Sequence, residues 1–152
     1  MNYKAPGVLS LILAFAAIGI AVYQLFAVSI IMGLAYTICT PIAFLNVLYH
    51  YCRKCPHVTD ETCRHVIFGW IVSKLFKPST PSKYSTGEIL LALSPLAVFF
   101  AFPQYWLLRQ INLFIAFWVL MLLAIIVVRT GVCKECKNIN CKFCQNANNC
   151  RP

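Results

Sequence analysis

The residues best suited to chemistry in this 152-residue chain are its nine cysteines. Apart from Cys39, they lie in two segments, the loop 50–66 (HYCRKCPHVTDETCRHV) and the tail 130–152. All three histidines lie in the loop as well. Thiolates and imidazoles are the ligands of zinc, and thiolates hold iron–sulfur clusters. The sequence therefore predicts a metal centre assembled from two segments that are far apart in the chain.

The spacing of these cysteines strengthens the prediction. Three Cys-x-x-Cys pairs occur, and each places two thiols on one short turn where both can bind a single ion. The loop contributes three cysteines and the tail five, which is enough for two four-thiolate sites. In one grouping Cys133, Cys136, Cys141 and Cys144 form one site; in others His57 or His65 takes part, or the pairs interleave. The candidate ligands are Cys52, Cys55, His57, Cys63, His65, Cys133, Cys136, Cys141, Cys144 and Cys150.

Two metals fit this pattern. Zinc is the commoner structural ion and takes four Cys or Cys/His ligands. However, two zinc-binding turns are usually separated by more residues than lie between Cys136 and Cys141. Compact runs with two-residue spacings are typical of iron–sulfur clusters. An iron–sulfur cluster and zinc therefore both stay open.

Other uses of clustered thiols are disulfide bonds and reversible thiol–disulfide exchange. Disulfides are rare in the cytoplasm, where charge places both segments (see below). Exchange is favoured by cations that stabilise a thiolate, and Lys54, Lys134 and Lys142 each lie between the cysteines of a pair. A thiol redox protein or a metal-ion handling protein is thus an alternative to a bound metal centre.

The elements that position the cysteines are membrane spans. Hydrophobic residues make up 61% of the chain and charged residues 11%, against about 45–50% and 25% in soluble domains. A spanning helix needs about 20 residues, so the apolar stretches predict an all-α integral membrane protein with four transmembrane helices. The first pair should reverse direction near Tyr23 and Gln24. The expected spans are about 7–24, 27–49, 87–103 and 111–129, within a membrane domain 1–129 that precedes the Cys-rich tail.

Local signals refine the third span and the loop. Ser85 and Glu88 have capping-box spacing, which predicts a helix start near Thr86. Pro95 should kink this helix, and Pro103 should end it. Residues 64–76 have helical spacing of apolar side chains but are too few to span, so they predict an interfacial amphipathic helix.

Charge sets the predicted orientation. The chain has 13 basic and four acidic residues, a net charge of +9. All basic residues except Arg109 fall on the side that holds both termini and the long loop. The positive-inside rule puts that side in the cytoplasm of a multi-pass protein of the cell (inner) membrane. The cations flank apolar runs, which indicates a lipid bilayer and not nucleic acid as their partner.

One stripe inside the second span is partly polar: Cys39, Ala43, Asn46 and His50 recur at helical spacing. It indicates either a path or a quinone or ion contact leading toward the loop, or interhelical hydrogen bonding by Asn46 with His50 at the interface. No arrangement of catalytic residues is present, so an enzyme is not the prediction. The expected function is metal binding, as an iron–sulfur electron-transfer or anchoring subunit with a protein partner or as an oligomer. The alternative is a non-catalytic membrane module with a structural zinc site.

Overall fold

The structure is a computed structural model that describes residues 5–55, 66–76 and 84–135. Within these ranges every regular element is helical and no strand occurs. The long helices are α1 (Ala5–Val28), α2 (Ile30–His50), α5 (Thr86–Ala101) and α7 (Ile111–Val127). The short elements are η1 (Cys52–Lys54), α4 (Val66–Leu75), α6 (Gln104–Leu107), η2 (Val128–Val132) and η3 (Cys133–Glu135). The predicted all-helical architecture with four long helices is confirmed.

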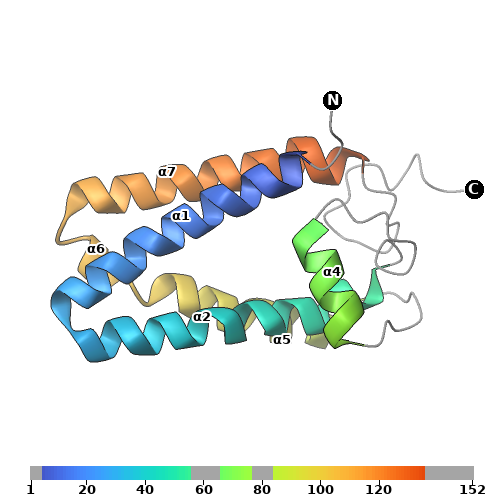
Figure 1. Ribbon diagram of the computed structural model, residues 1–152, viewed down its shortest axis with the longest axis horizontal. Helices are drawn as coiled ribbons and strands as arrows, with labels where there is room; N and C mark the ends of the chain where they lie inside the picture. The colour runs from blue at the N-terminus through green and yellow to red at the C-terminus, as the bar shows by residue number, and fades with distance from the viewer. Residues whose placement is uncertain (1–4, 56–65, 77–83, 136–152) are drawn as a thin grey trace, which may run out of the picture.

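The four long helices run up and down as a bundle (Figure 1). Helix α1 packs against both α7 and α2, and α5 packs against α2. Helix α6 joins α5 to α7 at one end. At the opposite end lie η1, α4, the start of α5 and η3, which we call the thiol end. The start of α1 and the end of α7 lie at this same end.

The first reversal of the chain differs from the prediction. We expected it near Tyr23 and Gln24, but α1 continues to Val28, and Ser29 alone separates it from α2. Gln24 is 4% exposed, and its Nε2 donates to the backbone oxygen of Trp106 in α6 at 3.4 Å. The polar residue therefore joins two helices instead of marking a turn.

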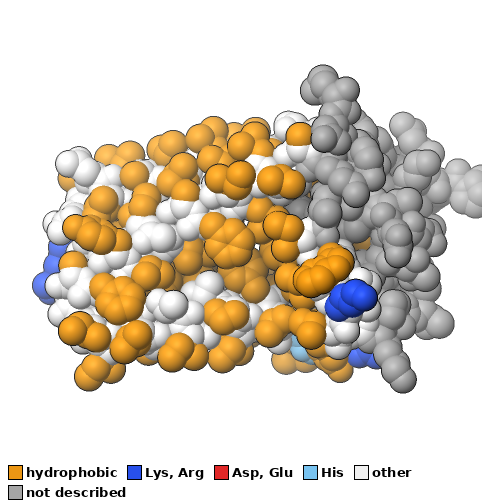
Figure 2. Space-filling view, viewed as in Figure 1, with side chains coloured by type: hydrophobic (Ala, Val, Ile, Leu, Met, Phe, Trp, Pro, Cys, Tyr) orange, Lys and Arg blue, Asp and Glu red, His pale blue; other side chains and the backbone are white. Residues whose placement is uncertain are grey.

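The helices are long and apolar enough to cross a membrane when the short elements that continue them are included. These stretches are Ala5–Val28, Ile30–Lys54, Thr86–Leu107 and Ile111–Val132. Large apolar side chains face outward, among them Ile31 at 79% and Val98 at 68% exposure. Figure 2 shows such side chains spread along the bundle, with cations near its two ends. Such an outer surface resembles that of a protein surrounded by lipid.

The predicted start and end of the third helix are confirmed. Helix α5 begins at Thr86 with a capping box, in which Glu88 Oε2 accepts the backbone N–H of Ser85 at 3.0 Å. Pro95 lies inside the helix, which ends at Ala101, two residues before Pro103. The expected helix at 64–76 is present as α4, although residues 64 and 65 lie outside the described part. Of the tail 130–152, the structure describes residues 130–135.

The reversal between α1 and α2 depends on a close approach at Gly33. A Cβ atom at this position would lie 2.4 to 2.6 Å from three ring carbons of Phe26. The ring therefore fills the space that a side chain would need. A Cβ at Gly19 in α1 would meet nothing within 4 Å.

Gly33→Ala should lower the free energy of unfolding by about 1–3 kcal/mol, because the Phe26 ring must move to admit the methyl group. The matched control Gly19→Ala should be neutral or stabilising by up to about 1 kcal/mol, since alanine favours the helix. Unfolding of the purified variants in detergent micelles measures both. Equal stability of the two variants would contradict the close packing at Gly33.

Candidate functional site

The structure describes three of the ten predicted ligands, and it places them all at the thiol end. Cys52 begins η1, Cys55 follows it, and Cys133 begins η3. No group of three or more Cys, His, Asp or Glu side chains suited to a metal occurs among the described residues. The other seven candidates lie outside the described residues: His57, Cys63, His65, Cys136, Cys141, Cys144 and Cys150.

The Cys52–Cys55 pair occupies one tight turn at the end of α2. The backbone N–H of Cys55 donates to the oxygen of Cys52 at 3.0 Å, which closes the turn. Both cysteines are half-buried and pack against a small cluster built on Leu48 of α2 and Val72 of α4, which are 3% and 0% exposed. The turn therefore rests on a packed apolar base provided by two helices.

An ion pair fixes the turn to the start of α5. Lys54 Nζ lies 2.5 Å from Glu88 Oε1, while the other carboxylate oxygen caps α5 through Ser85. One side chain thus stabilises the helix start and holds the Cys-x-x-Cys turn beside it. The sequence places Lys54 between two thiols, but the structure directs its ammonium group to Glu88.

Aromatic contacts hold the same turn. The hydroxyl of Tyr84, just before α5, donates to the backbone oxygen of Tyr51 at 3.0 Å, and the two rings stack with centroids 4.4 Å apart. The guanidinium carbon of Arg53 in η1 lies 5.2 Å from the centre of the Tyr49 ring in α2. The contact of Tyr84 with Tyr51 joins residues on either side of a loop, so helical spacing alone did not reveal it.

The third described thiol follows a close contact between the ends of α1 and α7. Helix α7 continues through η2, one π-helical turn, and a Cβ at Gly131 in this turn would lie 2.5 Å from Pro6 Cβ. The absence of a side chain at Gly131 lets η2 pack directly on the start of α1. Cys133 follows within two residues and is half-buried.

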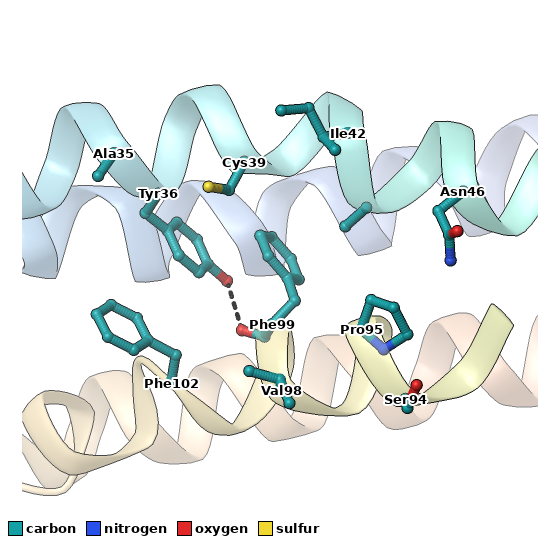
Figure 3. A pocket seen from close by; sticks show the side chains of 11 residues that line it. Ala35, Tyr36, Cys39, Ile42, Asn46, Ser94, Pro95, Val98, Phe99 and Phe102 are labelled. Carbon is teal, nitrogen blue, oxygen red and sulfur yellow. Dashed lines mark hydrogen bonds between the residues drawn. The ribbon is translucent and has the colours of Figure 1, made fainter. Parts of the chain in front are cut away.

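Three of the four stripe residues line a pocket between α2 and α5 (Figure 3). The pocket has a volume of about 670 Å³, and its lining includes Cys39, Ala43 and Asn46. Cys39 is an exposed thiol. His50 is not a lining residue, and its ring packs edge-on against Tyr49 with centroids 5.1 Å apart.

Asn46 compensates for a backbone defect in the facing helix. Pro95 has no N–H, so the carbonyl of Leu91, four residues earlier, loses its usual helical donor. Asn46 Nδ2 donates to this oxygen at 2.8 Å. The predicted interhelical hydrogen bond of Asn46 is therefore present, and its acceptor is the carbonyl that the proline leaves without a helical partner.

No family model, curated protein or solved structure matches this chain. A functional proposal therefore depends on the chemistry of the residues themselves.

Because Asn46 donates to the carbonyl that Pro95 leaves without a helical donor, substitutions at positions 46 and 95 should be energetically coupled in a double-mutant cycle. Asn46→Leu should lower the free energy of unfolding by about 1–3 kcal/mol, because it leaves the Leu91 carbonyl without a donor. In a Pro95→Ala background residue 95 regains its N–H, so Asn46→Leu should cost much less. Unfolding of the four proteins in mixed micelles gives the coupling energy. Equal costs in both backgrounds would show that Asn46 stabilises the bundle in some other way.

Proposed function

We propose that the chain is a multi-pass membrane protein that holds a metal centre at its thiol end. Membrane insertion is supported by four helices of sufficient length and by their outward apolar side chains. Lipid is the solvent that leaves such side chains exposed without cost. The bilayer is thus the first partner of this protein.

The proposed orientation places the thiol end in the cytoplasm. Described cations at this end are Arg53, Lys54, Lys74, Arg129 and Lys134. The opposite end has Arg109, whose guanidinium carbon lies 5.1 Å from the centre of the Tyr105 ring. Such an imbalance follows the positive-inside rule.

Helix α4 fits an interfacial position at the thiol end. Its Val72 is fully buried against α2, whereas Trp70 is 63% exposed. Lys74, in the last turn of the helix, is exposed as well. We propose that Trp70 enters the lipid headgroup region.

The observation that carries the metal proposal is the Cys52–Cys55 turn. Its two thiols are on one closed turn, and that turn is held by packing, by the Lys54–Glu88 ion pair and by Tyr84. A fixed pair of thiols lowers the entropic cost of binding an ion. The remaining ligands would come from Cys133 and from the predicted cysteines and histidines outside the described residues.

Two metal centres follow from this ligand set, and each implies a role. An iron–sulfur cluster makes the chain an electron-transfer or anchoring subunit of a larger complex. Zinc makes it a non-catalytic module whose folded thiol end binds a protein partner. Iron with inorganic sulfide supports the first role, and zinc without sulfide supports the second.

Metal content and two matched cysteine variants test the proposal. Protein purified anaerobically in detergent should contain close to stoichiometric zinc, or iron with comparable sulfide. Cys52→Ser and Cys55→Ser should each reduce the metal at least about tenfold, since each removes a ligand from the centre. Cys39→Ser should keep it, because Cys39 lies in the α2–α5 pocket and not at the thiol end.

Metal-free protein with oxidised thiols would contradict the metal centre and favour disulfides or thiol exchange. Equal metal loss in all three variants would also contradict the metal centre at the thiol end, because metal content would then depend on Cys39 as much as on the Cys52–Cys55 turn.

Orientation is tested by fusing reporters to the full chain. A fluorescent protein that folds only in the cytoplasm should fluoresce when it is joined after Pro152. A phosphatase that is active only outside the cytoplasm should be active when it is inserted beside Arg109 and inactive after Pro152. The reverse pattern would overturn the proposed orientation.

A further inference from the structure

We propose that the pocket between α2 and α5 binds a lipophilic alcohol, a molecule with an apolar body and one hydroxyl group. This proposal depends on membrane insertion but not on the metal centre. Asn46 and Ser94 lie toward one end of the pocket, and Tyr36 and Phe102 lie toward the other (Figure 3). The polar residues are on the side of the thiol end, because α2 runs toward it.

The pocket is a built feature, since contacts within it keep the two helices at a fixed separation. The Tyr36 hydroxyl donates to the backbone oxygen of Phe99 at 3.4 Å, and the two rings stack with centroids 4.4 Å apart. Near the polar end, Asn46 bridges to Leu91 at 2.8 Å. The small side chains of Cys39 and Ala43, which lie between these two contacts along α2, leave the space there unfilled.

The dimensions of the pocket suit an elongated small molecule. Its volume of about 670 Å³ is within the range of about 300–1,000 Å³ that ligand pockets have. Along α2 the lining extends from Ala35 to Asn46, about 16 Å at the helical rise per residue. This length admits a single chain or a flat ring system.

The free hydrogen-bonding group of Asn46 indicates which polar group a ligand in the pocket should have. Its Nδ2 faces the carbonyl of Leu91, which fixes the orientation of the amide. The amide oxygen accepts no hydrogen bond from the described residues, so it is the group that a ligand can reach. A ligand hydroxyl can donate to this oxygen, and the hydroxyl of Ser94 at the same end of the pocket can donate to it or accept from it.

The lining also argues against a charged headgroup. None of the described residues around the pocket is ionisable to a cation, and the remaining surface is mostly aliphatic and aromatic. A carboxylate or phosphate without a cationic partner is costly in apolar surroundings. A neutral hydroxyl satisfies the amide oxygen without that cost.

Photoaffinity labelling tests the proposal on the full chain. The probe is dodecanol that carries a diazirine near its hydroxyl, and the protein is held in nanodiscs of phosphatidylcholine and phosphatidylglycerol. Mass spectrometry of the digested protein should locate the label on pocket residues of α2 and α5. Excess unlabelled dodecanol should reduce this labelling, and dodecane should need about 3- to 10-fold higher concentration because it lacks the hydrogen bond.

Further competitors show which kind of lipophilic alcohol the pocket binds. Dodecanoate at pH 8 should compete poorly because it is charged. If a sterol competes better than dodecanol, the pocket prefers an alcohol with a ring system. If the sterol competes less well, the pocket prefers an alcohol with a single chain. Either result supports the proposal.

Two pairs of variants test whether binding of the probe and of dodecanol depends on the pocket and not on other surfaces of the bundle. Val98→Trp should fill the pocket and reduce labelling at least about fivefold at a fixed probe concentration. The control Ile115→Trp, at an exposed position of α7, should label normally. In the Pro95→Ala background, where Leu91 regains a donor, Asn46→Leu should weaken competition by dodecanol about 3- to 10-fold relative to Pro95→Ala alone.

Label spread evenly over all four long helices, or equal competition by dodecanol and dodecane, would overturn the proposal, because bulk lipid then fills the pocket. Probe-induced crosslinks between two chains would overturn it in favour of a second copy. Metal content is measured on the same samples. Normal metal with no specific labelling refutes the alcohol site alone, and specific labelling without metal refutes only the metal centre.

Discussion

The hydrogen bond from Asn46 to the carbonyl of Leu91 is the contact between α2 and α5 that meets a backbone defect. In lipid no water is present to satisfy a backbone group that a proline leaves without a donor. In a bilayer the carbonyl that Pro95 leaves without its helical donor would need another partner, and a side chain of a neighbouring helix can supply one. Because Asn46 supplies it, α5 is held against α2 at one defined position. Asn46 lines the end of the pocket that lies on the side of the thiol end.

The contacts at the thiol end continue the same pairing. Lys54 and Glu88 join the end of α2 to the start of α5, and Tyr84 joins the same segments through Tyr51. The Cys52–Cys55 turn lies between these contacts and rests on Val72 of α4. Three elements therefore define the place of two thiols. This support is what we propose the metal centre uses, because a fixed turn costs less entropy when it binds an ion.

Features encoded by neighbouring residues were predictable from the sequence. The length of the apolar runs gave four helices, and the spacing of Ser85 and Glu88 gave the start of α5. The reversal after Val28 was missed, because Gln24 is polar like a turn residue although it bonds to Trp106 across the bundle. Polarity alone does not distinguish a turn from a buried contact between helices.

Contacts between distant residues were not predictable from single-chain patterns. The ion pair of Lys54 with Glu88 and the bond of Asn46 to Leu91 each join positions more than 30 residues apart. Pro95 is a sequence signal for such a contact, since the carbonyl four residues before a proline in a helix lacks its usual N–H donor. The ligand set at the thiol end remains a prediction for all ten residues, seven of which lie outside the described part of the chain.

We propose that thiols at one end of the bundle bind a metal. X-ray absorption at the zinc and iron edges of the protein, purified anaerobically in detergent, tests it most directly because it reports the atoms bound to the ion. A metal held by these thiols should have mostly sulfur atoms as its nearest neighbours, at about 2.3 Å. A shell composed only of oxygen and nitrogen at about 2.0–2.2 Å, or no bound metal, would contradict it.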